Sequence, residues 1–395
     1  MRLSMWAYPW DLQDLGVETT YDDYRNKAGV NSISLAASYH AGRFLQPRSP
    51  HRKTYFPQDG TIYFTPEAKR WEEHKIKPLT ADNLTEKGDM LSVLIDQRQK
   101  HGLAVSCWTV CLHNTRLGMQ HPDDVTRNAF GDPNLYSLCP SSPAAGNYVT
   151  TLVADLTHNY QPDMVELESI GFMGFNHGYH HQKDGVGLNT EDEFLLSLCF
   201  CDHCVKGAKR HGVDATVAHQ QVRDLIEASC HRESPAAQFP NFPTDDIAAF
   251  KGLAALYGFL QWRSQPVTSL MDSIKKAAHP NSRIVLIEGE ECWKDGIDLT
   301  EINKACDGII MCAYEASPDE ITDMIKATRK TIGSEKYLGF GASAFFEHVK
   351  SSDALNQRTQ AAVSAGVDGI NFYNYGLIPE PRLNWIKNSI KPIRD

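Results

Sequence analysis

The sequence predicts an α/β protein, a (β/α)8 barrel with an elaborated loop between its fourth and fifth strands. Three observations support this fold class. Eight short apolar runs recur along the 395 residues, most of these runs are continuous rather than alternating, and each is followed by a turn and a helical pattern. Continuous apolar runs are typical of parallel strands that are covered on both faces, and eight strand–helix repeats close into a barrel.

The predicted strands are spread over the whole chain, as expected for a single barrel domain over residues 1–395. We expect them at residues 2–8, 31–38, 103–110, 163–168, 283–288, 308–313, 337–342 and 368–374. A doubly wound open sheet has the same alternation of strands and helices and is the main alternative. No glycine-rich phosphate-binding motif follows the first strand, and we therefore favour the barrel.

Three segments between the strands carry clear helix signals. Residues 80–102 begin with Thr and Asp, have apolar residues three and four apart, and end in Gly. Residues 317–333 open with Ser-Pro-Asp-Glu and also stop at Gly. Residues 351–369 lead directly into the last strand.

One connection is far longer than the others. More than a hundred residues separate the fourth and fifth strands, and they include the cysteine cluster at 199–204, a Pro-rich patch at 233–246 and a long helical run at 247–279. Structureless loops of this length are uncommon in compact domains. We therefore expect residues 169–280 to form a long helical insertion built on the barrel.

Composition excludes several kinds of partner. The formal net charge is −10, with no basic stripe of the kind that binds nucleic acid. No apolar run approaches the roughly 18–20 residues that cross a membrane. The N-terminal MRLSMWAYPW lacks the apolar stretch and cleavage site of a signal peptide, and we expect a cytoplasmic protein.

Four cysteines form a candidate metal site. Cys199, Cys201 and Cys204 have C-x-C-x-x-C spacing, and Cys139 lies about sixty residues earlier, before the fourth strand. In a reducing compartment cysteines are more often free thiols or metal ligands than disulfides. Zinc prefers four tetrahedral ligands, and thiolates supply them in structural sites.

These segments also carry a family resemblance. CPSSP at 139–143 and CFCDHC at 199–204 flank the fourth strand. In this they resemble family 42 glycoside hydrolases, the β-galactosidase-like barrels. The similarity covers about residues 100–290. It implies that Cys139, Cys199, Cys201 and Cys204 bind a structural zinc, and, since such proteins often form trimers, that the chain is a homo-oligomer.

The carboxyl ends of the predicted strands are rich in aromatic, amide and histidine side chains. Active sites of such barrels lie at these ends. Flat rings beside polar groups are typical of sugar binding, so we expect a carbohydrate substrate and no organic cofactor. The expected substrate-binding residues are Trp6, Tyr8, Tyr39, His40, Arg43, Trp108, His113, Asn114, His177, Tyr314, Glu315, Asn371 and Tyr373.

Glycoside cleavage requires two carboxyl groups, one protonated and one ionised. Glu168 closes the fourth strand, where the resembled family places its acid/base glutamate. That family has its second glutamate after strand seven, but YLGFGASAF at 337–345 contains none. Glu288, which directly ends the fifth apolar run, is our preferred partner, and Glu315 after strand six is the alternative.

A glycine-rich loop after the fourth strand, GFMGFNHGYHH at 171–181, brings three histidines together: His177, His180 and His181. No H-x-H or H-E-x-x-H pattern supports a catalytic metal, so we expect a substrate-contacting loop.

The sequence therefore predicts a glycoside hydrolase that cleaves an oligosaccharide or small glycoside. Two other functions fit the same residues: a sugar lyase or isomerase that uses His and Tyr, and a carbohydrate-binding barrel without catalysis.

Overall fold

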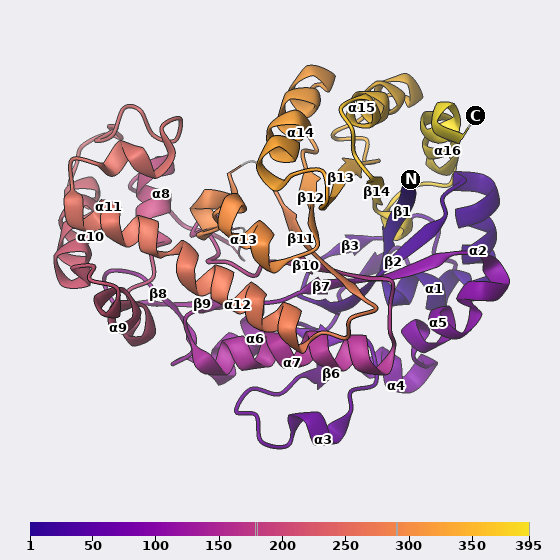
Figure 1. Ribbon diagram of the computed structural model, residues 1–395, viewed down its shortest axis with the longest axis horizontal. Helices are drawn as coiled ribbons and strands as arrows, with labels where there is room; N and C mark the ends of the chain where they lie inside the picture. Colours follow the sequence, from indigo (N-terminus) through magenta and orange to yellow (C-terminus); the bar gives the residue numbers. More distant parts are fainter. Residues whose placement is uncertain (178, 180, 290, 395) are drawn as a thin grey trace.

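In the computed structural model, which describes residues 1–177, 179, 181–289 and 291–394, eight parallel strands close into a barrel (Figure 1). The strands follow one another in chain order, and the last pairs with the first. They are β1 (Arg2–Ala7), β2 (Ser32–Tyr39), β7 (Ala104–Val110), β10 (Met164–Glu168), β11 (Arg283–Glu288), β12 (Gly308–Cys312), β13 (Tyr337–Ser343) and β14 (Gly369–Tyr373). Each overlaps a predicted strand, and the (β/α)8 barrel is confirmed.

The strands are buried on both faces. Every residue of β2 and of β13 is buried. Inside the barrel, side chains such as Met164, Val285 and Ile310 form one apolar cluster. A larger cluster packs between the outer faces of the strands and the helices. Two apolar surfaces on each strand explain why the sequence shows continuous rather than alternating hydrophobic runs.

A polar layer crosses the barrel interior just below the strand ends. The buried carboxylate of Glu166 accepts hydrogen bonds from Trp6 Nε1 at 2.8 Å, Ser34 Oγ at 2.7 Å and Asn371 Nδ2 at 3.2 Å. Side chains alternate along a strand, so Glu168 points into the same interior one layer nearer the carboxyl ends.

Helices cover the outside of the barrel. They are α1 (Pro9–Leu15), α2 (Val17–Asp22), η1 (Asp23–Ala28), α5 (Met90–His101), α7 (Pro143–Asn159), α12 (Ser264–Ala277), α13 (Leu299–Ala305), α14 (Pro318–Ile332), α15 (Ser352–Ser364) and α16 (Pro381–Arg394). The predicted start of α14 is confirmed, because Ser317 and Glu320 form a capping box. No helix in the described part of the chain is long and apolar enough to span a membrane.

The single helix predicted at residues 80–102 is wrong. The segment forms α4 (Asp82–Lys87) and α5, separated by Gly88 and Asp89. Gly88 has φ of 88°, which ends the first helix, and the side chain of Asp89 caps the second. The apolar spacing continues across the break, so periodicity alone does not detect it.

The long connection between β10 and β11 is mostly helical. It contains α8 (Thr190–Leu196), α9 (Asp202–Arg210), α10 (Ala215–Cys230), η2 (Asp246–Phe250), α11 (Ala254–Trp262) and α12. Helices α8 to α11 gather to one side of the barrel, at the left of Figure 1, and α12 runs back along it. The helical run predicted at 247–279 is thus interrupted, with Arg263 at the junction of α11 and α12.

Shorter elements extend two other loops, and the sequence did not predict them. Between β2 and α4 lie β3 (Phe44–Leu45), β4 (Thr54–Tyr55), β5 (Thr61–Ile62), α3 (Ala68–Trp71) and β6 (Leu79–Thr80). β5 pairs with the carboxyl end of β2 and lengthens the sheet there. After β7 come α6 (Thr115–Gln120), β8 (Val125–Arg127) and β9 (Pro133–Leu138).

Candidate active site

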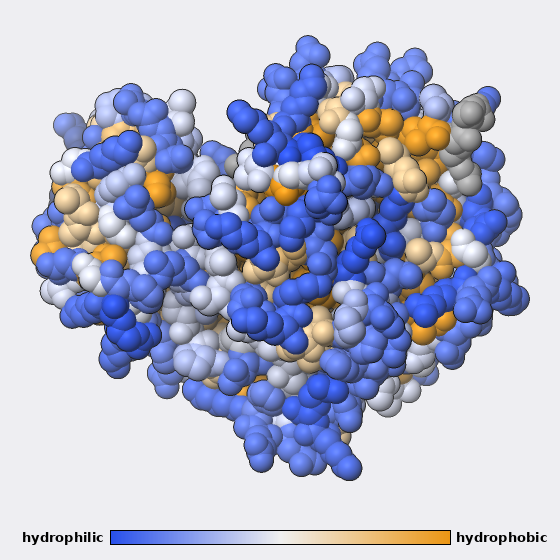
Figure 2. Space-filling view, in the orientation of Figure 1, coloured by the Kyte–Doolittle hydropathy of each residue, from blue (hydrophilic) through white to orange (hydrophobic). Residues whose placement is uncertain are grey.

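A cavity of about 1080 Å³ lies at the carboxyl ends of β10, β11 and β12. Its far wall comes from α8, and its rim includes the start of α14. In the space-filling view the surface is indented between the α8–α11 group and α14 (Figure 2). Of the predicted site residues, the cavity is lined by Glu168, Glu288, His177, Tyr314 and Glu315.

Glu168 ends β10 and is held from the neighbouring strand. The indole N–H of Trp108 on β7 donates to Glu168 Oε2 at 2.5 Å. Burial raises the pKa of Glu168, while the Trp108 hydrogen bond acts in the opposite direction by favouring the carboxylate. One oxygen of Glu168 is therefore fixed on Trp108, and the other is available to the cavity.

Glu288 ends β11 and faces two other carboxyl groups. Burial raises the pKa of Glu288 well above its usual value, and the charges of Asp295 and Glu168 raise it further. Burial also raises the pKa of Asp295 to about 7. A buried carboxyl group that faces two others retains its proton near neutral pH.

The sequence did not predict Asp295. It lies at the end of η3 (Cys292–Asp295), a short 3₁₀ helix in the loop after β11. Gly296 follows with φ of 75°, and the loop folds back so that the carbonyl of Asp295 accepts a hydrogen bond from the Phe172 N–H at 2.9 Å. A carboxylate followed by Gly in a strand-end loop is the one sequence signal that points to it.

The loops after β12 and β13 add a second wall. The Tyr314 ring stacks with those of Tyr373 and His348, at centroid distances of 5.7 Å for both pairs. His348 Nδ1 lies 2.8 Å from the Ser343 hydroxyl at the end of β13. His348 lines the cavity and was missed by sequence reasoning, which considered only carboxylates after strand seven.

Several predicted sugar contacts do not line this cavity. Tyr8 is fully buried, and its hydroxyl lies 3.1 Å from that of Tyr39 and 3.0 Å from that of Tyr373. Trp6 and Asn371 are hydrogen-bonded to Glu166 inside the barrel. The structure thus groups these side chains below and beside Glu168 rather than on the cavity surface.

Two further predicted residues lie outside the cavity, and a third lies on its rim. The Asn114 side chain accepts a hydrogen bond from Leu117 N at 2.8 Å, capping α6, and donates to the carbonyl of Gly60 at 3.2 Å. Arg43 is exposed on the loop after β2. Glu315 is exposed at the cavity rim.

Three histidines pack against one another beside the cavity, His40 stacked on His113 and His177 edge-on to it. The ring centroids of His40 and His113 are 4.2 Å apart, and those of His113 and His177 are 4.4 Å apart. Burial lowers the pKa of all three, that of His113 to about 2. The three imidazoles are therefore neutral at physiological pH, and His177 is the one that lines the cavity. His180, in the same glycine-rich loop as His177, lies outside the described residues.

The four predicted metal ligands converge. Cys139 Sγ lies 3.9 Å from Cys199 Sγ and 3.6 Å from both Cys201 Sγ and Cys204 Sγ. Four sulfurs at about 2.3 Å from a tetrahedral metal are about 3.8 Å apart. Burial raises the pKa of Cys139 and of Cys204, while hydrogen bonds from the other three thiols lower the pKa of Cys201. This buried cluster could therefore hold a metal ion.

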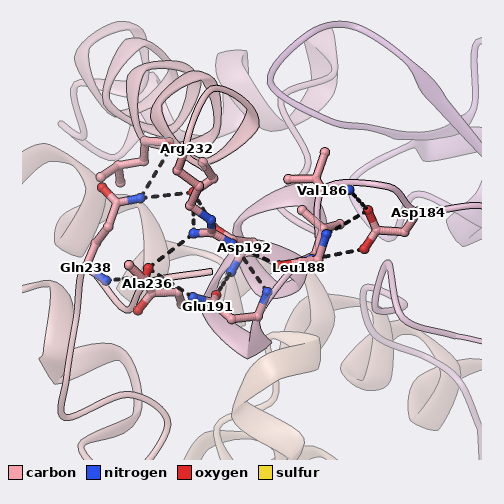
Figure 3. A network of polar contacts seen from close by, with 12 residues as sticks. Asp184, Val186, Leu188, Glu191, Asp192, Arg232, Ala236 and Gln238 are labelled. Carbon is pink, nitrogen blue, oxygen red and sulfur yellow. Dashed lines mark hydrogen bonds and ion pairs between the residues drawn. The ribbon is translucent and has the colours of Figure 1, made fainter. Parts of the chain in front are cut away.

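A polar network fixes α8, the far wall of the cavity (Figure 3). Arg232 donates to Asp192 Oδ2 at 2.5 Å, and Glu191 accepts from the Gln238 N–H at 2.5 Å. Asp184 accepts three backbone N–H bonds from the loop that precedes the helix. These contacts tie α8 to the end of α10 and to the Pro-rich patch, so the patch supports the wall.

Comparison with known proteins shows the fold. No family model and no curated protein matches the chain. Among solved structures, α-L-fucosidase isoenzyme 2 from Paenibacillus thiaminolyticus is 13% identical, with a TM-score of 0.59 over 100% of this chain and 49% of that one. A β-galactosidase from Marinomonas ef1 is 12% identical, with a TM-score of 0.55 over 98% and 59%.

The chain therefore spans about half to three-fifths of the length of these two proteins. At such low identity the likeness establishes the shared barrel.

Proposed function

We propose that the protein is a glycoside hydrolase that cleaves a glycosidic bond of an oligosaccharide or small glycoside. The observation that carries the proposal is that Glu168 and Glu288 line one cavity at the carboxyl ends of adjacent barrel strands. The fucosidase and β-galactosidase that share the fold act on glycosides, but function must be argued from the site itself.

The electrostatic surroundings support a division of roles between the two carboxyl groups. Glu168 accepts a hydrogen bond from Trp108, which favours its ionised form. Glu288 faces Asp295 and Glu168, and their charges favour its protonated form. We therefore assign the proton of the resting site to Glu288, the reverse of the acid/base role that the family resemblance implies for Glu168.

In this scheme Glu288 donates its proton to the glycosidic oxygen as the bond from that oxygen to the anomeric carbon breaks. The Glu168 carboxylate either attacks the anomeric carbon or removes a proton from the attacking water. Tyr314 and His348 provide flat surfaces on the cavity wall against which a sugar ring can pack. The carbohydrate is thus held between the carboxyl groups and the second wall.

We also propose that the four-cysteine cluster holds zinc. The thiol spacing fits a tetrahedral thiolate site, and the N–H of Arg127 donates to Cys199 Sγ at 3.3 Å. Such a metal would link the segment just before α7 to α9, which the contact of Cys204 Sγ with Ser141 Oγ at 3.3 Å also joins. Its role is structural, and no catalytic step passes through it.

A panel of chromogenic glycosides tests the proposed activity. We expect turnover of at least one glycoside, and a loss of about a thousandfold or more in Glu168→Gln; Glu288→Gln should lose as much only on a glycoside whose leaving group must be protonated. Glu347→Gln is the matched control, because Glu347 is an exposed carboxylate after β13 that does not line the cavity. Full activity in Glu168→Gln, or no turnover of any glycoside by the wild type, would contradict the proposal.

A further inference from the structure

His348, on the cavity wall after β13, has its two ring nitrogens in different surroundings. Nδ1 lies 2.8 Å from the hydroxyl oxygen of Ser343, at the end of β13. No group in the described part of the chain lies within hydrogen-bond distance of Nε2. The ring is close to parallel with those of Tyr314 and Phe345, at interplanar angles of 27° and 11°. The imidazole is thus held by its neighbours and through Nδ1, and Nε2 is the nitrogen left for a ligand.

The Ser343 hydroxyl determines which nitrogen of His348 carries the proton. Ser343 is 3% exposed, and its Oγ accepts a hydrogen bond from the Phe345 N–H at 3.1 Å. The hydroxyl hydrogen also needs an acceptor, because a buried donor without one is costly, and among the described residues His348 Nδ1 is the one within reach. Ser343 therefore donates to Nδ1, and in a neutral imidazole the proton then lies on Nε2.

The protonated Nε2 is a donor beside a cavity that is rich in acceptors. Seven of the described residues that line the cavity are Asp or Glu, and an ionised carboxylate can only accept hydrogen bonds. Lys294, the one Lys or Arg among these lining residues, is already paired with Glu291 at 2.5 Å. A sugar hydroxyl that donates its hydrogen to a carboxylate still needs a donor for its own oxygen. The Nε2–H of His348 can supply that hydrogen bond.

We propose that His348 is a specificity-determining residue, which donates a hydrogen bond from Nε2 to a hydroxyl oxygen of the sugar, and that Ser343 is the positioning residue that sets this tautomer. The inference rests on the proposed function and deepens it by naming the group that is recognised. With the proton on Nε2, the site selects an oxygen that accepts. A sugar with a hydrogen or an ammonium group in that place offers no acceptor and is a poorer substrate.

Nitrogen NMR of the protein with isotopically labelled histidine determines the tautomer without any substrate. The spectrum is recorded at about pH 8.5, where an ordinary imidazole is neutral. The signal of His348 is the one that disappears in His348→Gln. His40 and His219 are internal references, because Nδ1 of His40 and Nε2 of His219 lie 2.7 Å and 2.6 Å from backbone carbonyls, which can only accept. His348 should match His219, with the proton on Nε2, and not His40.

Ser343→Ala tests whether the hydroxyl sets the tautomer. The variant should shift the His348 signal toward a mixture of both tautomers, because neither nitrogen then has a fixed partner. Ser38→Ala is the matched control, since Ser38 is also buried near a strand end and its hydroxyl donates to the carbonyl of Val110 at 2.6 Å. The control should leave the His348 signal unchanged.

The donor role is tested with the nitrophenyl glycosides of the panel and with analogues of each that lack a single hydroxyl. At one hydroxyl position the wild type should prefer the hydroxylated glycoside by about twofold to tenfold in kcat/KM, the range for one neutral hydrogen bond. His348→Gln places an amide N–H near the position of Nε2 and should keep this preference. His348→Asn, whose amide reaches only the position of Nδ1, should lose it.

A proton on Nδ1 of His348, or a tautomer that Ser343→Ala leaves unchanged, would overturn the assignment. A His348→Asn variant that keeps every hydroxyl preference of the wild type would overturn the donor role. The spectra need no turnover. A protein that cleaves no glycoside therefore refutes the proposed function and the donor role, while the tautomer and the part played by Ser343 are decided separately.

Discussion

Trp108→Phe isolates the hydrogen bond that we hold responsible for keeping Glu168 ionised. The substitution removes the N–H that lies 2.5 Å from Glu168 Oε2 and keeps an aromatic ring in its place. A hydrogen bond to a charged group contributes about 1.5–3 kcal/mol. Each 1.4 kcal/mol or so is tenfold, so ionisation of Glu168 should become about ten- to a hundredfold less favourable.

The assay is the dependence of kcat/KM on pH. A group that must be ionised loses activity as the pH falls through its pKa. Losing the indole N–H of Trp108 raises the pKa of Glu168. The acid limb of the profile should therefore move to higher pH, and the plateau should begin at a higher pH. A limb that stays in place, or moves to lower pH, would refute the assignment of Glu168 as the ionised partner.

Trp6→Phe is the matched control, because Trp6 Nε1 also donates to a glutamate of β10, at 2.8 Å. Its partner Glu166 lies inside the barrel and not in the cavity. The control should lower the free energy of unfolding and leave the acid limb where it is.

The remaining predictions concern packing, charge and metal. Gly171→Ala should lower the free energy of unfolding by about 1–3 kcal/mol in chemical denaturation, because the new Cβ would lie 2.4 Å from the carbonyl oxygen of Asp295. Gly258→Ala is the control and should not destabilise the fold, because a Cβ at this position of α11 meets open space. Asp295→Asn should flatten the pH dependence of unfolding. With a folded-state pKa of about 7, Asp295 binds its proton more tightly when folded, so wild-type stability falls as the pH rises from about 4 to 7, and an unchanged slope in the variant would contradict this. Cys204→Ser should reduce the zinc content by mass spectrometry to well below one ion per chain, and full retention would remove Cys204 from the ligand set.

The barrel could be predicted because its strands are hydrophobic on both faces and therefore appear in the sequence as continuous apolar runs. Continuous runs such as 163–168 and 283–288 mark strands to within a residue of β10 and β11. The segment between β2 and α4 had no such signal, because its strands are two residues long and depend on pairing with one another or, for β5, with the end of β2. The break at Gly88 was hidden by apolar spacing that continues across it.

The site could be predicted only where it lies at strand ends. Glu168 and Glu288 end adjacent parallel strands, so their approach follows from the register of the barrel. Asp295 lies in the loop after β11 and reaches the cavity because this loop folds back at Gly296. Its position therefore could not be predicted from where the strand ends. Trp6 and Tyr8 were expected to bind substrate, but both are buried inside the barrel mouth.

Leaving-group dependence tests the central claim most directly. The measurement is kcat/KM for two glycosides of the same sugar, one with a dinitrophenolate leaving group, which needs no proton, and one with a simple alcohol. Glu288→Gln should lose most activity on the alkyl glycoside and keep most of it on the dinitrophenyl glycoside, while Glu168→Gln should lose both. Equal losses on the two substrates in Glu288→Gln would contradict the paired-carboxyl account.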